Sequence, residues 1–303
     1  MQWTYSSTLP EHPNNTVRFL ELITPVTSQT TKTDFVIPAK DPRSHILHLA
    51  IKKVAHYCGS HLGLIHIVHD IHPGLKLDDL PHLKRYKRII RLIHSSQYVS
   101  RRTFESAYAR NCSLPTCRQN WYWQQFLKLL SFRIPDISSH IVIWDADTVL
   151  CSRIDFFLNQ LPIVMRSNAE YHIPYYQTFN KLMGTNVYPP FSFVSQYSPC
   201  FKSELVDIYN FINLRARKEP SLESFTDEHL FMCFILSSLV APQNGSSFSE
   251  YETISLFRII TLRPFLITTK RNFRHGSYLP LPFWVLSPIL QSLGYSSITF
   301  ENQ

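Results

Sequence analysis

The order of three apolar segments near the start of the chain most constrains its fold. TDFVIPAK, residues 33–40, is predicted to be a strand that ends at Pro38, and a helix is predicted to begin near Pro42 and run through HILHLAIKKVAHYC. LGLIHIVHD, residues 62–70, is predicted to be the next strand, closed by Asp70 and a turn. Two strands joined by a helix pair in parallel through a right-handed crossover. The sequence therefore predicts an α/β fold with a mostly parallel central sheet flanked by helices.

A second apolar segment runs directly into two carboxylates. IVIWDADTVL, residues 141–150, favours a short core strand, and Asp145 and Asp147 then point to the same side of it. Two adjacent carboxylates repel each other, and a divalent cation such as Mg²⁺ or Mn²⁺ removes that cost. The sequence predicts a metal site at this strand end. Helix-capping or surface aspartates are the structural alternative.

The remaining pattern predicts one catalytic domain, because strands and helices follow each other without a linker from residue 33 to 276. Residues 1–32 are predicted to be an extended polar lead-in, and residues 277–303 an apolar tail interrupted by prolines. The other predicted helices are 118–132, 203–217, 226–240 with Thr226 as its cap, and the segment after Ser249, and a further strand is expected within 192–201.

Composition excludes several classes of protein. The chain has 303 residues, of which 44% are hydrophobic and only seven are glycine. Neither glycine-rich phosphate-binding motif occurs, so a metal, basic side chains or a helix N-terminus must hold any phosphate. The sequence has no signal-like apolar segment and no stretch approaching 18 apolar residues, and six cysteines are scattered along it. These features predict a cytoplasmic protein with free thiols.

The net charge of +8 is concentrated in HLKRYKRIIRLIHSS, residues 82–96. This stretch favours a phosphate-bearing partner, such as a nucleotide or an anionic lipid, although an ordinary solvated element is the alternative. No nucleic-acid-binding signature occurs, so nucleic acid is not an expected partner. Phe283, Trp284 and Leu286 add a predicted interfacial foothold. Peripheral attachment at the inner face of a membrane is therefore a further expectation.

Residues 128–158 resemble the metal-site segment of GT-A-fold glycosyltransferases. In that group a helix carrying Lys-Leu leads to a strand, to Asp-x-Asp-Thr and to a later acidic residue. The matching residues here are Lys128, Asp145, Asp147, Thr148 and Asp155. More widely, DFVIPAKD, WYWQQFLKL, DADT, EYHIPYY, SFVSQ and SEYE resemble an uncharacterised bacterial and viral family of polysaccharide-type glycosyltransferases. Ile254 and Ser255, after SEYE, depart from that family's aromatic and small residues.

The resemblance implies a GT-A-type, Rossmann-like domain that uses a nucleotide-diphosphosugar donor, UDP- or GDP-linked, and a glycan or lipid-linked acceptor. It also implies a Mn²⁺ or Mg²⁺ ion that joins Asp145 and Asp147 to the pyrophosphate, with His275 as a late ligand. Gly276 would permit a tight turn there, and Arg271 would assist Arg274 with phosphate oxygens. The expected donor-binding residues are Pro38, Ala39, Lys40, Asp70, Lys128, Asp145 and Arg274.

An inverting transferase also needs a base for the acceptor hydroxyl, whereas a retaining one does not. The candidates are Glu250 first, then Asp227 and Glu252. Each lies near a predicted helix start, where an acidic side chain can instead satisfy backbone amides. The sequence does not decide the stereochemistry.

Two other functions fit the same ten residues. IVIWDADTVL also matches the opening motif of haloacid-dehalogenase-like phosphatases, in which Asp145 would be a nucleophile and Asp147 an acid/base. The later acidic pair of that class is missing after residue 150. The non-enzyme alternative is a GT-A-like protein that binds a nucleotide-sugar or glycan without transferring it.

Overall fold

The computed structural model describes residues 32–300, apart from residues 112–113, 168–169, 223–224, 243–244, 269–270 and 279–280. Residues 1–31 of the predicted lead-in lie outside the described residues. Free cysteines are found at 58, 117, 151, 200 and 233. In the described part of the chain, no helix is both long enough and apolar enough to cross a membrane.

A five-stranded sheet in the order β3-β2-β1-β4-β8 forms the centre of the fold. Its strands are β1 (Thr33–Pro38), β2 (Leu62–His69), β3 (Ile90–His94), β4 (His140–Trp144) and β8 (Tyr197–Phe201). The first four strands are parallel, and β8 pairs with β4 in the antiparallel sense. The predicted mixed α/β fold with a mostly parallel sheet is confirmed. All four parallel strands therefore end at one edge of the sheet.

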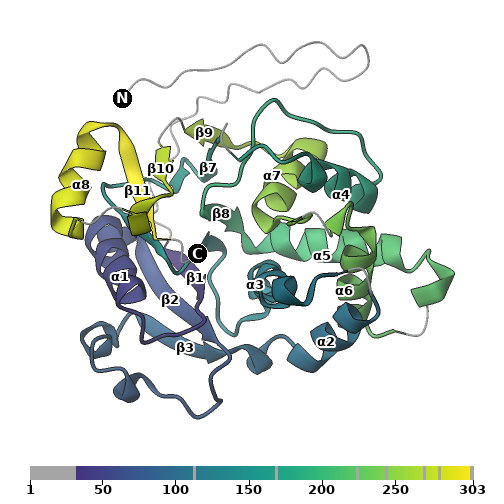
Figure 1. Cartoon of the computed structure of the whole chain (residues 1–303), viewed down its shortest axis with the longest axis horizontal. Helices are drawn as coiled ribbons and strands as arrows, with labels where there is room; N and C mark the ends of the chain where they lie inside the picture. Colours follow the sequence, from purple (N-terminus) through teal and green to yellow (C-terminus); the bar gives the residue numbers. More distant parts are fainter. Residues whose placement is uncertain are drawn as a thin grey trace.

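Alternation along the strands divides the core between the two faces of this sheet. Phe35 and Ile37 of β1 pack on one face against α1 (His45–Cys58), whereas Val36 packs on the other. Most of the remaining helices cover that second face (Figure 1). They are α2 (Arg101–Ala109), α3 (Gln119–Leu129), α4 (Ile173–Met183), α5 (Lys202–Ala216), α6 (Asp227–Ser238) and α7 (Glu250–Ile260).

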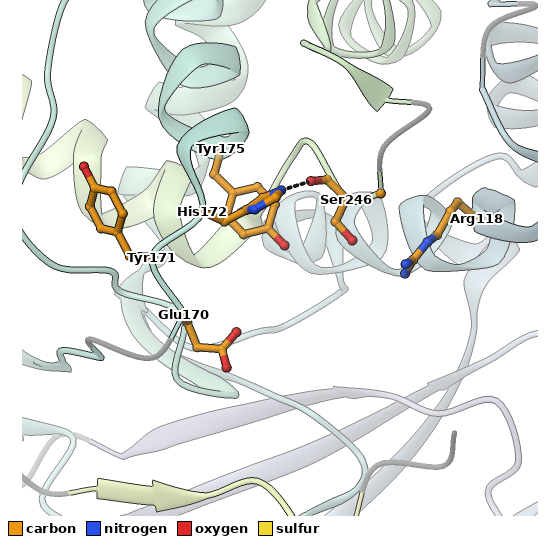
Figure 2. Close-up of a pocket in the computed structure, with 7 residues that line it drawn as sticks. Arg118, Glu170, Tyr171, His172, Tyr175 and Ser246 are labelled. Carbon is orange, nitrogen blue, oxygen red and sulfur yellow. Dashed lines mark hydrogen bonds between the residues drawn. The ribbon is translucent and has the colours of Figure 1, made fainter.

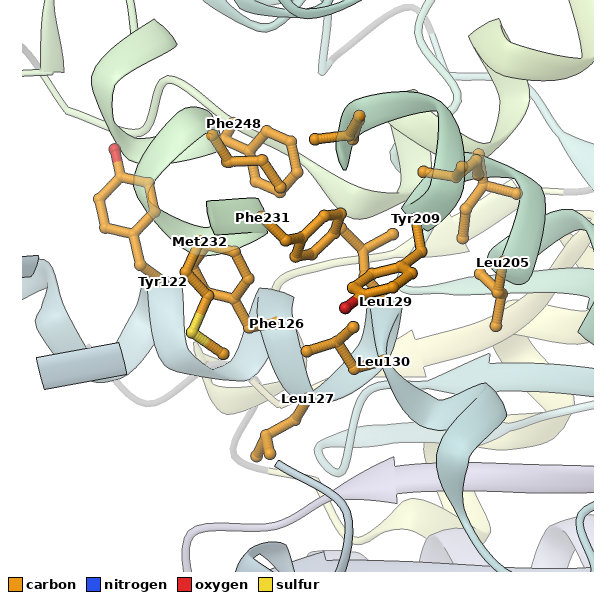
Figure 3. Packing of buried hydrophobic residues seen from close by; sticks show 14 of the residues in the cluster. Tyr122, Phe126, Leu127, Leu129, Leu130, Leu205, Tyr209, Phe231, Met232 and Phe248 are labelled. Atoms are coloured by element: carbon orange, nitrogen blue, oxygen red, sulfur yellow. The ribbon is translucent and has the colours of Figure 1, made fainter. Parts of the chain in front are cut away.

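The helical side of the core is built around α3 (Figure 3). Its residues Tyr122 and Phe126 are fully buried, and the ring of Phe126 contacts Phe231 of α6. Every residue of α6 from 230 to 236 is buried, so this helix has no polar face. A helix that is apolar all round must be surrounded by protein, and α6 lies against α2, α4 and α5. The α3 helix is thereby fixed where it crosses the carboxyl ends of the strands.

Two smaller sheets extend the central one. The first is ordered β10-β11-β5 and the second β6-β7-β9. Their strands are β5 (Thr148–Leu150), β6 (Phe157–Leu158), β7 (Leu161–Met165), β9 (Leu266–Thr268), β10 (Arg271–Phe273) and β11 (Tyr295–Thr299). The residues expected as a C-terminal tail form α8 (Phe283–Ser292) and β11, which pairs with β5 and β10.

The sequence located most elements correctly and misjudged two. The predicted helices 203–217 and 226–240 correspond to α5 and α6, and Thr226 and Ser249 accept backbone N–H groups as the caps of α6 and α7. Within 192–201, only the last five residues form a strand. IVIWDADTVL is not one strand, because β4 ends at Trp144 and β5 begins at Thr148 in another sheet.

Candidate functional site

Asp145 and Asp147 lie in a tight turn between β4 and β5. The Thr148 backbone N–H donates to the carbonyl of Asp145 at 3.1 Å, and the Trp144 indole donates to the carbonyl of Thr148 at 2.8 Å. The backbone N–H of Phe300 donates to the carbonyl of Asp147 at 2.9 Å. The sequence predicted that strand alternation would orient the two carboxylates. That prediction is wrong, because both aspartates lie in a turn between two strands. The turn and its neighbour β11 hold them at the carboxyl edge of the sheet.

Lys128 joins Asp145 to α7. This side chain is only 3% exposed, and its ammonium lies 2.5 Å from Asp145 Oδ1 and 2.6 Å from Glu250 Oε1. It also donates to the hydroxyl of Tyr251 at 3.2 Å. A buried ammonium needs such partners, because an unpaired charge in the interior is very costly. Burial lowers the pKa of Lys128, but the two carboxylates outweigh burial and raise that pKa above its ordinary value. Lys128 is therefore charged.

Glu250 and Glu252 begin the same helix but have different surroundings. Both are 1% exposed. Burial raises the pKa of Glu250, and Lys128 offsets part of that shift. Burial also raises the pKa of Glu252 to about 7, although Ser192, the Phe193 backbone N–H and a tyrosine hydroxyl donate to it. Glu250 faces the aspartate turn, whereas Glu252 holds the chain before β8.

Gln196 extends the site to Arg274. With its amide oriented to satisfy both partners, Gln196 donates to Asp145 Oδ2 at 2.6 Å and accepts from Arg274 Nε at 3.2 Å. Its φ of 68° lies in the left-handed region, which is uncommon for a residue other than glycine. Arg274 also forms an ion pair with Glu170. The structure thus brings together Lys128, Asp145 and Glu250 directly, and Arg274 through Gln196.

The expected donor pocket follows the same sheet edge. Asp70 comes directly after β2, where its carboxylate accepts from Ser95 and from the Trp123 indole. Trp123 and Lys128 are on one helix, α3, so this helix reaches the ends of both β2 and β4. At the end of β1, Ala39 is buried and Lys40 is exposed. The predicted residues Pro38, Ala39, Lys40 and Asp70 therefore line the carboxyl edge beside Asp145.

His275 is linked to the aspartate turn through Phe300. It forms an isolated antiparallel bridge with Phe300, which in turn contacts Asp147. Two strand spacings, on the order of 10 Å, therefore separate the backbones of His275 and Asp147. Gly276 does not have a left-handed φ. Glycine is required there for close packing, because an added Cβ would lie 2.8 Å from Ile298 and 2.9 Å from the Thr299 carbonyl. His275 is exposed and stays a prediction as a metal ligand.

Asp227 lies apart from this group. It is the first residue of α6, its side chain is about half exposed, and it forms an ion pair with Arg217. The neighbouring Glu228 pairs with Arg133 and accepts the Ser100 backbone N–H. An acidic residue in the first turn of a helix is favoured by the helix dipole. These contacts give Asp227 a structural role, and its role as a base stays a prediction.

A cavity of about 350 Å³ lies beside the start of α7 (Figure 2). Its lining residues are Arg118, Glu170, Tyr171, His172, Tyr175, Gly245 and Ser246. His172 shares a 2.7 Å hydrogen bond with the carbonyl of Ser246, which fixes one wall to the other. Burial raises the pKa of Tyr175 to about 12, and nearby Glu250 adds to the shift. Glu170 lines this cavity and pairs with Arg274, which contacts Asp145 through Gln196.

The aspartate turn suits a hard cation that is completed by substrate oxygens. Among the described residues, no group of three or more His, Cys, Asp or Glu side chains could hold a metal ion alone. Mg²⁺ commonly uses one or two carboxylates together with water and substrate phosphates. Asp145 holds Lys128 and Gln196, and the oxygens of Asp145 and Asp147 are the candidate donors of this turn. This donor set fits a metal that arrives with a phosphate substrate.

Comparisons with known proteins do not identify a family for this chain. No protein-family model matches the chain, and no curated protein matches it. Among solved structures, the chain is similar to the apo structure of WbbM, a bifunctional glycosyltransferase, with 12% sequence identity and a TM-score of 0.45. The match covers 95% of this chain and 48% of that one, so this chain spans about half its length. Function must therefore be inferred from the site.

Sequence reasoning missed three members of the site: Gln196, Tyr251 and Glu170. Each contacts a predicted residue that is distant in the sequence, so the pattern of neighbouring residues did not predict the contact. All three nevertheless lie in segments that carried the family resemblance, since SFVSQ contains Gln196, EYHIPYY contains Glu170 and SEYE contains Tyr251.

Proposed function

We propose that this chain is a metal-dependent glycosyltransferase of the GT-A type, which moves a sugar from a UDP- or GDP-linked donor to a glycan or lipid-linked acceptor. One observation carries the proposal. Lys128 is buried between Asp145 at the end of β4 and Glu250 at the start of α7. A single ion-pair cluster thereby joins a paired-aspartate turn to a candidate base. Ligands of open α/β sheets bind at this edge.

On the donor side, a bound Mn²⁺ or Mg²⁺ would neutralise the charge that develops on the departing nucleoside diphosphate. Asp147 and Asp145 would hold that ion. Lys128 keeps Asp145 in one orientation by fixing Oδ1, and Gln196 fixes Oδ2. Arg274 is linked to the same aspartate, which favours a role in binding phosphate oxygens. Asp70 and Lys40 would face the nucleoside, as the resemblance implies.

On the acceptor side, Glu250 is the best candidate for the base. Its pKa is raised by burial, which makes its carboxylate a better proton acceptor near neutral pH. The cavity lined by Tyr171, Tyr175 and Ser246 lies beside it and offers aromatic surface with polar edges. We assign this cavity to the acceptor, with its hydroxyl directed toward the start of α7, where Glu250 lies near the lining residue Tyr175. Glu252 and Asp227 have structural partners instead.

Donor turnover tests this proposal. Purified protein should hydrolyse a UDP- or GDP-sugar slowly in the presence of Mn²⁺, and the rate should fall at least about a hundredfold in Asp147→Asn. Asp207→Asn is a matched control, because this partly exposed aspartate of α5 pairs with Arg263 and not with the cluster. Equal rates in both variants, or turnover of a generic phosphate ester in place of the sugar donor, would refute the assignment.

A further inference from the structure

Among the described residues, the outer face of α8 is uncharged and exposed. FWVLSPILQS carries no charged side chain. Leu286 and Leu290 are buried against α1 and β11, so Leu286 is not available as the interfacial foothold that the sequence predicted. Trp284 instead is 77% exposed, and Ile289 and Leu293 are 46% and 56% exposed. Several large apolar side chains exposed on one uncharged helix make it a candidate interaction site.

Cations border this helix at both ends. Lys53 of α1 lies 5.1 Å from the centre of the Phe283 ring. At the other end, Arg271 donates to the carbonyl of Leu293 at 2.5 Å. Lys52, one residue before Lys53, is exposed on the outer side of α1. An apolar strip with cations at its margins matches the depth profile of a bilayer surface, where charged groups stay at the headgroups and apolar groups enter below them.

The basic stretch predicted from the sequence adjoins the same side of the molecule. Its apolar residues Leu83 and Ile90 are buried, and its cations Lys84, Arg85, Lys87, Arg88 and Arg91 are all exposed. Asp78 offsets one of them, since it pairs with Lys84 at 3.6 Å. Arg85 connects this segment to α1 through a 3.0 Å hydrogen bond with His48. In Figure 1 the segment before β3, α1 and α8 follow one another along the left of the molecule.

We propose that this surface, formed by α8, the outer side of α1 and residues 84–91, is a docking face for an anionic lipid bilayer. Trp284 and Ile289 would enter the interface, and the cations of α1 and residues 84–91 would lie among the headgroups. The mixture of an exposed uncharged helix and a cluster of cations that is offset only at Lys84 argues for lipid as the occupant. β11, which follows α8 in the chain, leads to Phe300, whose backbone N–H donates to the carbonyl of Asp147. The inference does not depend on the proposed transferase activity.

Vesicle co-sedimentation of the full chain tests the docking face. We expect binding to phosphatidylcholine vesicles that contain phosphatidylglycerol, weakening as salt is added, and little binding to phosphatidylcholine alone. Lys87→Gln with Arg88→Gln should weaken binding about 25-fold, because each cation near an anionic surface contributes about a factor of five. Lys181→Gln with Lys218→Gln removes two exposed cations elsewhere and should leave binding unchanged.

The apolar part is tested separately. Trp284→Ser should weaken binding about tenfold or more, since a large aromatic side chain leaves the interface. Leu214→Ser is the matched control, because Leu214 is 64% exposed on α5. Circular dichroism of each variant verifies folding. Equal binding to neutral vesicles, equal effects of test and control variants, or no binding at low salt would overturn the proposal. Self-association that Trp284→Ser abolishes, without vesicle binding, would assign the face to a second copy and overturn it too.

Discussion

Glu252 should make the free energy of unfolding fall as the pH rises, and Glu252→Gln should remove that fall. Glu252 is 1% exposed and accepts from the Ser192 hydroxyl, the Phe193 backbone N–H and the Tyr176 hydroxyl, all at Oε1. Among the described residues, its other oxygen has no hydrogen-bond partner. The carboxylate form therefore carries a buried charge without a cation beside it. A glutamine keeps the accepting oxygen and removes the charge.

The magnitude follows from the two pKa values. Burial raises the pKa of Glu252 from its ordinary 4.5 to about 7. Because the folded-state pKa is the higher one, the folded protein binds the proton more tightly than the unfolded chain does. The resulting stabilisation is complete below pH 4.5 and is lost as the pH rises to 7. Over that window the free energy of unfolding should fall by about 3 kcal/mol on account of this group.

Urea unfolding at a series of pH values measures this effect. The difference in unfolding free energy between wild type and Glu252→Gln should be small near pH 5, and the variant should be more stable by about 3 kcal/mol near pH 8. Glu219→Gln, at an exposed position, should follow the wild type throughout. A constant difference between wild type and Glu252→Gln would refute the reasoning. Loss of sugar transfer in a stable Glu252→Gln variant would instead make Glu252 the base.

Three further expectations follow from the buried ion pairs and the packing. Lys128→Met leaves the carboxylates of Asp145 and Glu250 facing each other and should destabilise the protein by about 3–5 kcal/mol, less at low pH; thermal unfolding that matches wild type at neutral pH would contradict this. Arg258→Met removes the buried partner of Glu204, which lies at 2.8 Å, and should lower the free energy of unfolding by about 3–5 kcal/mol. A decrease below about 1 kcal/mol in urea unfolding would contradict this expectation. Limited proteolysis should give no two stable folded halves, because the central sheet takes strands from residue 33 to residue 201 and β11, near the C-terminal end of the described region, pairs with β5.

The central sheet could be predicted because its signals are local. The strands at residues 33 and 62 and the helix between them carry continuous apolar patterns, and their order alone requires a parallel pair. The caps Thr226 and Ser249 were likewise local signals. The ends of β4 and β5 were not predictable from pattern, because apolar residues continue on both sides of the aspartates. A turn stabilised by Phe300 interrupts the run, and that contact spans more than 150 residues.

The same distinction applies to the site. Asp145 and Lys128 were identified through a motif, but the motif did not show that both belong to one ion-pair cluster with Glu250. That cluster joins positions 128, 145 and 250, and it depends on how α3 and α7 pack against the sheet edge. The two acidic candidates Glu250 and Glu252 also looked equivalent in sequence. Only packing separates them, since Glu250 faces Lys128 and Glu252 faces Ser192.

Titration calorimetry of UDP and GDP, with and without Mn²⁺, tests the central claim most directly. Wild-type protein should bind one of the two nucleotides only when Mn²⁺ is present. Asp147→Ala should lose that binding while keeping the wild-type circular dichroism spectrum and unfolding midpoint, because Asp147 lies in a turn and not in the core. Nucleotide binding that is unchanged in Asp147→Ala, or that is equally strong without Mn²⁺, would contradict the assignment of a metal-dependent nucleotide-sugar site to the Asp145–Asp147 turn.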